Sequence, residues 1–434
     1  MAVIAGGTGG SSGRAQEATP KPNDDAFDLQ WAHPLIGVQE AWNTGKGDGA
    51  TVAILDTGVD FTHEDLRGRL LQGRNFVRRD RTAQDDNGQG THLAGIVAAT
   101  ANNRSGVAGI APQTLILPVK VLDQEDEGTE RNVLDGIAYA IERRAGVLLL
   151  DLDRDIALSE GGNTFRKAIE GAFAAGVLPV LSAEHPYLLS AAFSDAPALV
   201  VAGLTRESKA PTYDNADGVG EARWGLAAPS GAGDGSENDI LSTMWPHARQ
   251  PVGGPRQEFG RYAYDADNAQ AAAHVAGAAA ILRGLGQSAQ QAADRILQSA
   301  TEAGPRGRDP QFGRGILAVG ASVQGLAPAR PAGGTASPPA SQPQGGAPPT
   351  TPSPPGASTP ASPTEETGAP MPPPSGATTV PLILAEPDVD YVGGLAAAGE
   401  PQEGRLPVIP IVIFLLALGT ATITWALRRR TGPA

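Results

Sequence analysis

Continuous apolar runs are the feature that most limits how this chain can fold. Five such runs lie between residues 50 and 204, in ATVAILDTGVD, QTLILPVKVLD, GVLLLDLD, GVLPVLSA and PALVVAGL. Strands that are apolar at every position are buried on both faces, which is typical of a parallel sheet covered by helices. Helical patterns lie between them in THLAGIVAATA, RNVLDGIAYAIERR and NTFRKAIEGAFAAG. The alternation predicts an α/β fold of three layers with a doubly wound, mainly parallel sheet.

Composition changes along the chain and divides it into five segments. Residues 1–26 form a flexible tail without the features of a signal peptide, and residues 27–326 suffice for one large core. Residues 327–405 are rich in Pro, Ser, Thr and Gly, which predicts a disordered, extended stalk and a juxtamembrane linker. Residues 406–427 carry no charge and precede three arginines in the tail 428–434, which predicts one transmembrane helix.

The three arginines also predict the orientation of this single-pass membrane protein. Basic residues favour the cytoplasmic flank of a span, so we expect a cytoplasmic C-terminus and an extracytoplasmic large domain. No export signal is visible in the sequence. Two explanations remain open: a misassigned start, or a tail anchor that leaves the domain in the cytoplasm.

Charge and cysteine content exclude several classes of function. The net charge of −14 argues against a nucleic-acid partner, which requires a basic surface. The chain has no cysteine, and this excludes disulfides, thiol catalysis and cysteine-ligated zinc.

Two polar residues stand where chemistry is expected in such a fold. Asp56 ends an apolar run, at the carboxyl end of a predicted strand, where doubly wound sheets bind their ligands. His92 follows two glycines at the start of a predicted helix. A strand-end carboxylate can orient such a histidine, as in a hydrolytic triad. The alternatives are a turn-forming aspartate and a packed histidine.

Several stretches together resemble the subtilases, the subtilisin-like serine peptidases. VAILDTGVDFTHEDL resembles their aspartate motif, and GQGTHLAG resembles their histidine motif, usually Gly-His-Gly-Thr-His-Val-Ala-Gly. DNAQAAAHVAG resembles their serine motif, usually Gly-Thr-Ser-Met-Ala-Ala-Pro-His-Val-Ala-Gly. The resemblance covers nearly all of residues 27–326. It implies a subtilisin-like topology, serine endopeptidase activity, and triad positions at Asp56, His92 and Ala269.

The same resemblance shows where the chain departs from the family. The nucleophile position holds Ala269 in place of serine, and the oxyanion asparagine aligns with His185, preceded by Glu184. The substrate-binding Ser-Leu-Gly aligns with Asp151, Leu152 and Asp153. An extended substrate would pair with this edge through main-chain hydrogen bonds. Changes at all three places predict an inactive member that binds a peptide or protein in its groove. Asp56 and His92 are then expected to hold each other by a hydrogen bond.

Other interpretations stay open at this point. The rival function is an active serine endopeptidase with a displaced nucleophile, for which the candidate hydroxyls are Ser182, Ser230, Ser236 and Ser242. A protein that has decayed is a third. The layout is also similar to that of the mycosins, membrane-anchored subtilases, although other bacterial subtilases share it. We expect no cofactor. The acidic segment 123–130 raises calcium as an alternative, but such a run is usually a solvated loop.

Overall fold

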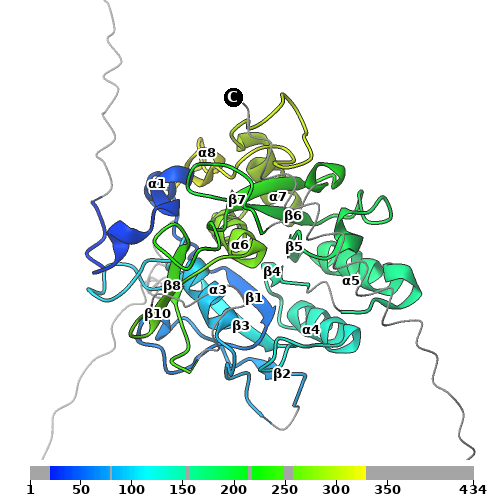
Figure 1. The fold of residues 1–434 in the computed structure, drawn as a ribbon, viewed down its shortest axis with the longest axis horizontal. Coiled ribbons are helices and arrows are strands. Elements are labelled where there is room, and N and C mark those ends of the chain that lie inside the picture. Colours follow the sequence, from blue (N-terminus) through cyan, green and yellow to red (C-terminus); the bar gives the residue numbers. More distant parts are fainter. Residues whose placement is uncertain (1–19, 79–80, 153–155, 214–217, 248–257, 329–434) are drawn as a thin grey trace, which may run out of the picture. The chain divides into compact units, whose positions relative to one another are not determined.

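The computed structural model describes residues 20–78, 81–152, 156–213, 218–247 and 258–328 (Figure 1). Most of the predicted N-terminal tail, nearly all of the stalk and the whole predicted span lie outside these residues. No helix within the described part is long and apolar enough to cross a membrane. The predictions of a stalk and a span therefore stay predictions.

A seven-stranded sheet forms the middle layer. Its strands are β1 (Thr51–Asp56), β2 (Arg74–Asn75), β3 (Leu115–Lys120), β4 (Val147–Leu150), β5 (Leu178–Ser182), β6 (Leu199–Leu204) and β7 (Gly225–Pro229). All neighbours pair in parallel, in the order β2-β3-β1-β4-β5-β6-β7. The five predicted apolar runs supply β1, β3, β4, β5 and β6. A second, antiparallel sheet contains β8 (Ile240–Thr243), β9 (Glu258–Phe259) and β10 (Tyr262–Asp265), in the order β8-β10-β9.

Helices cover both faces of the parallel sheet. The α-helices are α1 (Ala32–Ile36), α2 (Val38–Ala41), α3 (Gln89–Ala98), α4 (Glu130–Glu142), α5 (Asn163–Ala174), α6 (Asn268–Gly284), α7 (Ala289–Ser299) and α8 (Val319–Ser322). The short 3-10 helices are η1 (Phe27–Leu29), η2 (Glu64–Leu66), η3 (Ser159–Gly162), η4 (Pro186–Leu189) and η5 (Val219–Glu221). One buried cluster joins the sheet to α3 and α6, and another joins it to α4 and α5. The predicted three-layer, doubly wound α/β fold is confirmed.

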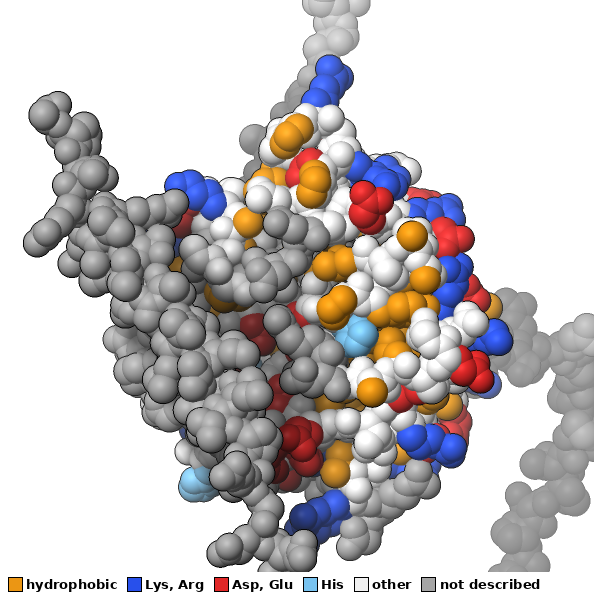
Figure 2. Space-filling view, turned by 45° about the vertical axis from the view of Figure 1, so that its right-hand side comes forward, with side chains coloured by type: hydrophobic (Ala, Val, Ile, Leu, Met, Phe, Trp, Pro, Cys, Tyr) orange, Lys and Arg blue, Asp and Glu red, His pale blue; other side chains and the backbone are white. Residues whose placement is uncertain are grey.

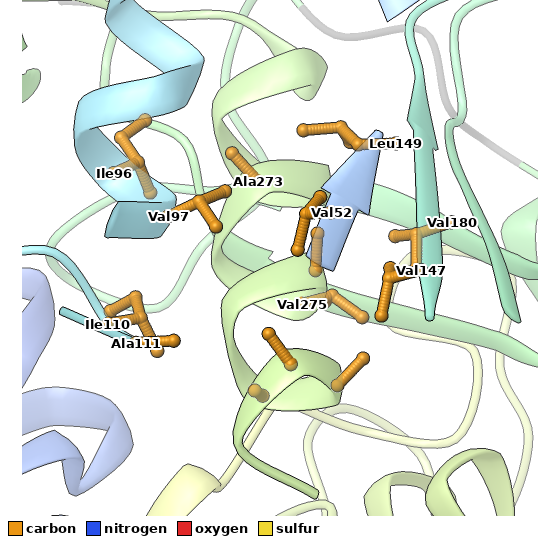
Figure 3. Close-up of a cluster of buried hydrophobic side chains, with 14 of the residues drawn as sticks. Val52, Ile96, Val97, Ile110, Ala111, Val147, Leu149, Val180, Ala273 and Val275 are labelled. Carbon is orange, nitrogen blue, oxygen red and sulfur yellow. The ribbon is translucent and has the colours of Figure 1, made fainter. Parts of the chain in front are cut away.

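Helix α6 lies in the larger of these two clusters. Figure 3 shows Ala273 of this helix between Val97 of α3 and Val52 of β1, and Val275 beside Val147 of β4. Fifteen of its 17 residues are buried, and most of them are alanine. Small side chains let a helix approach its neighbours closely, so α6 fits between α3 and the sheet.

Strand β1 marks the point where the winding direction of the sheet reverses. The chain adds β2 and β3 on one side of β1 and then crosses over to add β4 to β7 on the other side. In open α/β sheets, ligands bind outside the carboxyl ends of the strands at such a point. On the face drawn in Figure 2, acidic side chains gather in a hollow, whereas Lys and Arg lie mainly toward the margin.

Candidate functional site

Three neighbouring strands end side by side in polar residues. Leu55 pairs with Leu150 and Leu150 pairs with Leu181, so the next residues along, Asp56, Asp151 and Ser182, are also neighbours. Adjacent strands lie about 4.8 Å apart, and alternate residues share a face. These three side chains therefore project on the face that α3 and α6 cover. Ser182 Oγ donates a hydrogen bond to Asp151 Oδ1.

Asp56 is fully buried and only partly hydrogen-bonded. Its Oδ1 accepts a hydrogen bond from the Thr57 amide at 2.7 Å, while its Oδ2 has no hydrogen-bond partner among the described residues. Burial raises the pKa of Asp56 to about 8, and the carboxylates of Asp151 and Asp85 contribute to the rise. Burial therefore favours the neutral, protonated form of this carboxyl group.

His92 does not form the hydrogen bond to Asp56 that we expected. Its Nε2 lies 3.1 Å from the carbonyl oxygen of Ile240 and 3.1 Å from that of Ala263. Both are acceptors, so Nε2 carries the proton and donates to β8 and β10. The ring is fully buried, and its Nδ1 lies 3.5 Å from Gln270 Nε2. The prediction of an Asp56–His92 hydrogen bond is wrong. The His92 ring instead connects α3 to the antiparallel sheet through hydrogen bonds.

Gln89 occupies the place beside the strand ends where a histidine was expected. It is the first residue of α3, and its Nε2 donates to Asp151 Oδ2 at 2.9 Å. Both carboxylate oxygens of Asp151 are thus hydrogen-bonded, one to Gln89 and the other to Ser182. The sequence held a signal for Gln89: the family motif contains two histidines, and this chain retains only the second.

The first turn of α6 is closed by a capping box. Asp267 Oδ1 accepts from the Ala269 amide at 2.5 Å, and Gln270 Oε1 accepts from the Asp267 amide at 2.9 Å. Asn268 Oδ1 accepts from the Gly203 amide at 2.7 Å, which ties the helix to the end of β6. Ala269 is fully buried. Position 269 therefore has neither a hydroxyl group nor a free amide.

Asp267 lies among other carboxylates. Burial raises its pKa well above the usual range, and the neighbouring Glu184, Asp151 and Asp265 raise it further. The hydrogen bond from the Ala269 amide opposes this rise. Sequence reasoning missed Asp267 and Asp265, because an aspartate before a helix is most simply explained as an N-cap.

His185 uses its ring locally. Its Nδ1 accepts from the Tyr187 amide at 3.1 Å, so Nε2 carries the proton, and Nε2 lies 3.1 Å from the carbonyl oxygen of Ile156. The single N–H of the neutral ring is therefore committed to the main chain. The adjacent substrate edge is described only in part: Leu152 is buried in the core, and Asp153 lies outside the described residues.

The four candidate hydroxyls all bond groups other than a histidine ring. Ser182 donates to Asp151, Ser242 donates to the carbonyl of His92, and Ser236 bonds Asp234. Ser230 accepts from the Tyr213 hydroxyl at 2.7 Å. None of these bonds joins a serine to a base of the kind that activates a nucleophile.

The acidic segment 123–130 forms a turn in which Asp123 Oδ1 accepts from the amides of Glu125 and Glu127. Within the described ranges, no group of three His, Asp or Glu side chains is placed to hold a metal ion. Calcium at this segment stays an untested alternative.

Comparison with known proteins finds matches across most of this domain. The model of the subtilase family matches residues 47–315. Thermitase from Thermoactinomyces vulgaris is 33% identical over 289 residues, which cover 64% of this chain and 94% of that protein. The thermophilic serine proteinase of Bacillus sp. (strain AK1) is 31% identical and covers 68% of this chain and 67% of its own length. Among solved structures, a protease from Pseudoalteromonas arctica PAMC 21717 is similar with a TM-score of 0.56 and 25% identity, over 70% of this chain and 99% of that one.

Proposed function

The chain belongs to the subtilase family, and from that premise we propose that it is a catalytically inactive member, a pseudopeptidase, whose domain binds a peptide or protein segment. The observation that carries this proposal is position 269, where a buried methyl group replaces the nucleophile and Asp267 occupies the amide. A methyl group cannot attack a carbonyl. Loss of a triad nucleophile costs about six orders of magnitude in turnover, roughly as much as loss of the whole triad.

We further propose that the base position of the triad is 89, not 92. The family motif carries histidines at both places, and only position 89 reaches the strand ends, through the bond from Gln89 to Asp151. His92 lies in the packed interior with its Nε2 directed at two carbonyl groups. A glutamine amide cannot accept a proton near neutral pH, so the base is lost together with the nucleophile.

The oxyanion position supports the same proposal. A catalytic donor must point at the developing negative charge, and loss of one such donor costs about two to three orders of magnitude in turnover. The N–H of His185 points instead at the carbonyl of Ile156. Asp151 places a carboxylate at the start of the substrate edge, where the family has serine. The remaining function that suits this site is binding.

The location of the domain is also a proposal. We propose that residues 327–405 form a stalk, that residues 406–427 cross the membrane, and that the domain is extracytoplasmic. Support comes from the proline-rich composition, the uncharged stretch and the three arginines that follow it.

The rival is a serine endopeptidase with a displaced nucleophile. One observation favours it: the bond from Ser182 to Asp151 places a hydroxyl group beside a carboxylate at the strand ends. Against it, Ser182 is fully buried and a carboxylate bonded to Gln89 is a weak base.

Labelling by a fluorophosphonate probe separates the two proposals. We would treat the full-length chain with the probe and measure peptide turnover, beside Ala269→Ser and the double variant Ala269→Ser with Gln89→His. We expect no labelling above a heat-denatured control for the natural chain or the single variant, because the single variant still lacks a base. Labelling of the natural chain that disappears in Ser182→Ala would overturn the proposal.

A further inference from the structure

Arginines are concentrated in one short stretch of this acidic chain. Residues 67–81, RGRLLQGRNFVRRDR, contain six arginines and one acidic residue, whereas the whole chain carries a net charge of −14. Residues 69–76 run along β3 and include β2, the edge strand of the parallel sheet. The stretch therefore places positive charge along one edge of the sheet.

Two arginines from separate elements share one aromatic ring at this edge. Arg74 of β2 lies 5.7 Å from the ring centre of Tyr139 in α4, and Arg143, the C-cap of α4, lies 5.8 Å from the same centre. Arg74 also lies 5.2 Å from the ring centre of Phe76, which meets the Tyr139 ring edge-on at 5.8 Å. Stacking on an aromatic ring attracts a guanidinium group and holds it in place. Two positive groups are therefore positioned together where β2 meets α4 (Figure 1).

The turn after β2 adds two further arginines. The Arg78 amide donates to Asn75 Oδ1 at 2.7 Å, and the Arg81 amide donates to the carbonyl of Arg78 at 3.0 Å. Asn75 Nδ2 donates to the carbonyl of Thr82 at 3.1 Å. Asn75 thus holds both ends of this turn against β2, next to Arg74.

The exposed arginines of this edge form no ion pair with the described part of the chain. We call them the arginine surface: Arg74, Arg78, Arg81, Arg143 and Arg144. Other surface arginines of the same domain do have partners. Arg131 pairs with Asp135 at 3.0 Å, and Arg166 pairs with Glu170 at 2.9 Å. The positive charge of the arginine surface is therefore available to a ligand.

This surface lies on a different face of the sheet from the candidate site. Phe76 and Tyr139 belong to the buried cluster that joins the sheet to α4 and α5. Asp56, Asp151 and Ser182 project on the opposite face, which α3 and α6 cover. A ligand of the arginine surface is therefore independent of the proposed function.

We propose that the arginine surface binds an acidic polypeptide segment, a run of Glu and Asp residues in a partner protein. A guanidinium group presents a planar fork of donors that matches a carboxylate, and such charge-assisted hydrogen bonds are strong. The net charge of −14 repels a broad anionic surface such as a membrane. A narrow acidic segment contacts only the local positive charge, so it suits this surface better.

Binding of labelled hexapeptides tests this proposal. We would measure fluorescence anisotropy of hexaglutamate and of hexaglutamine with the full-length chain in nonionic detergent. We expect hexaglutamate to bind about tenfold more tightly than hexaglutamine, although the chain as a whole repels it. The difference should shrink as salt is added, because salt screens exposed charges.

Paired variants locate the effect. Arg74→Gln with Arg143→Gln should weaken the binding of hexaglutamate about tenfold, and so should Arg78→Gln with Arg81→Gln, which leaves the stacked pair in place. Circular dichroism verifies that each variant folds, and the second pair replaces the first if the loss of stacking unfolds it.

The matched control removes two positive charges elsewhere on the domain. Arg223 stacks on the Trp224 ring at 5.7 Å, and Arg306 is exposed. Arg223→Gln with Arg306→Gln should bind hexaglutamate as the natural chain does.

Four outcomes would overturn the inference and leave the proposed function untouched. The first is equal binding, or absence of binding, of the two hexapeptides. The second is binding of hexaglutamate that persists in both arginine pairs. The third is an equal loss in the control pair, which would indicate a general effect of charge. The fourth is displacement of hexaglutamate by glycerol phosphate at concentrations at which free glutamate leaves it bound, which would assign the surface to a lipid head group.

Discussion

Asp56 is a buried carboxyl group with one unsatisfied oxygen, and its charge state affects the stability of the fold. Its pKa is raised to about 8 in the folded protein, against about 3.9 in an unfolded chain. For an acid with a raised folded pKa, the folded state binds the extra proton between these two values. The free energy of unfolding therefore falls as the pH rises from about 4 to about 8.

Asp56→Asn removes this pH dependence. Asparagine resembles the protonated acid and keeps an oxygen that accepts from the Thr57 amide. We expect the variant to be more stable than the natural chain at pH 8, by an amount of order 1 kcal/mol or more, and similar to it near pH 4. Thermal unfolding at the two pH values measures this. A variant that is less stable at pH 8 than the natural chain would contradict the assignment, and Asp195→Asn on the surface serves as the control.

His92 and Gln89 are expected to contribute different amounts to the free energy of unfolding. His92→Ala leaves a cavity and removes the donor to the carbonyls of Ile240 and Ala263, so we expect a loss of about 3 kcal/mol of stability. Gln89→Ala removes one hydrogen bond of a partly exposed side chain and should cost about 1 kcal/mol. Urea denaturation compares the two variants. Equal, small losses would argue that His92 is not the packed residue described above.

At the scale of the element, the start of α6 combines two opposing effects. The capping box stabilises the helix, whereas the carboxylate that makes it stands among Glu184, Asp151 and Asp265. Asparagine is as good an N-cap as aspartate and carries no charge. Substitutions at this N-cap can therefore separate the contribution of the cap to stability from the contribution of the charge.

Substitutions at Asp267 test this separation. We expect Asp267→Asn to leave stability unchanged or to raise it at neutral pH, and Asp267→Ala to be about 1 kcal/mol less stable than Asp267→Asn. Helix α7 provides a matched control, because Ser288 and Gln291 form a capping box there. Ser288→Ala should lose about 1 kcal/mol in the same urea measurement. If Asp267→Asn lost as much stability as Asp267→Ala, the repulsion among the neighbouring carboxylates would not measurably lower the free energy of unfolding.

For the whole molecule, the open question is the side of the membrane on which the domain lies. The chain has no cysteine, so a single introduced thiol reports its own position without a background. With the domain outside, a thiol from Ser337→Cys in the stalk should react with a membrane-impermeant maleimide in intact cells. A thiol from Thr431→Cys in the tail should react only after the cells are opened. The reverse pattern would support a tail anchor with a cytoplasmic domain.

Local sequence by itself determined much of this protein. The apolar runs specified β1, β3, β4, β5 and β6, because strands buried on both faces require apolar residues throughout. The periodic segments specified α4 and α5, since an amphipathic helix repeats every 3.6 residues, whereas a run of small apolar residues specified α3, which is buried almost throughout. The alanine at position 269 is likewise a fact of sequence. No folding can supply the missing hydroxyl group at that position.

Tertiary structure alone decided which polar groups meet and in which direction the ring of His92 points. Asp56 and Asp151 are 95 residues apart in the chain, and only the pairing of β1 with β4 makes them neighbours. His92 bonds carbonyls 148 and 171 residues away, so its direction depends on where the antiparallel sheet packs against α3. The local motif allowed His92 or position 89 to face the strand ends. Packing placed His92 in the interior and Gln89 beside Asp151, because a hydrogen bond depends on distance and angle, which a motif does not contain.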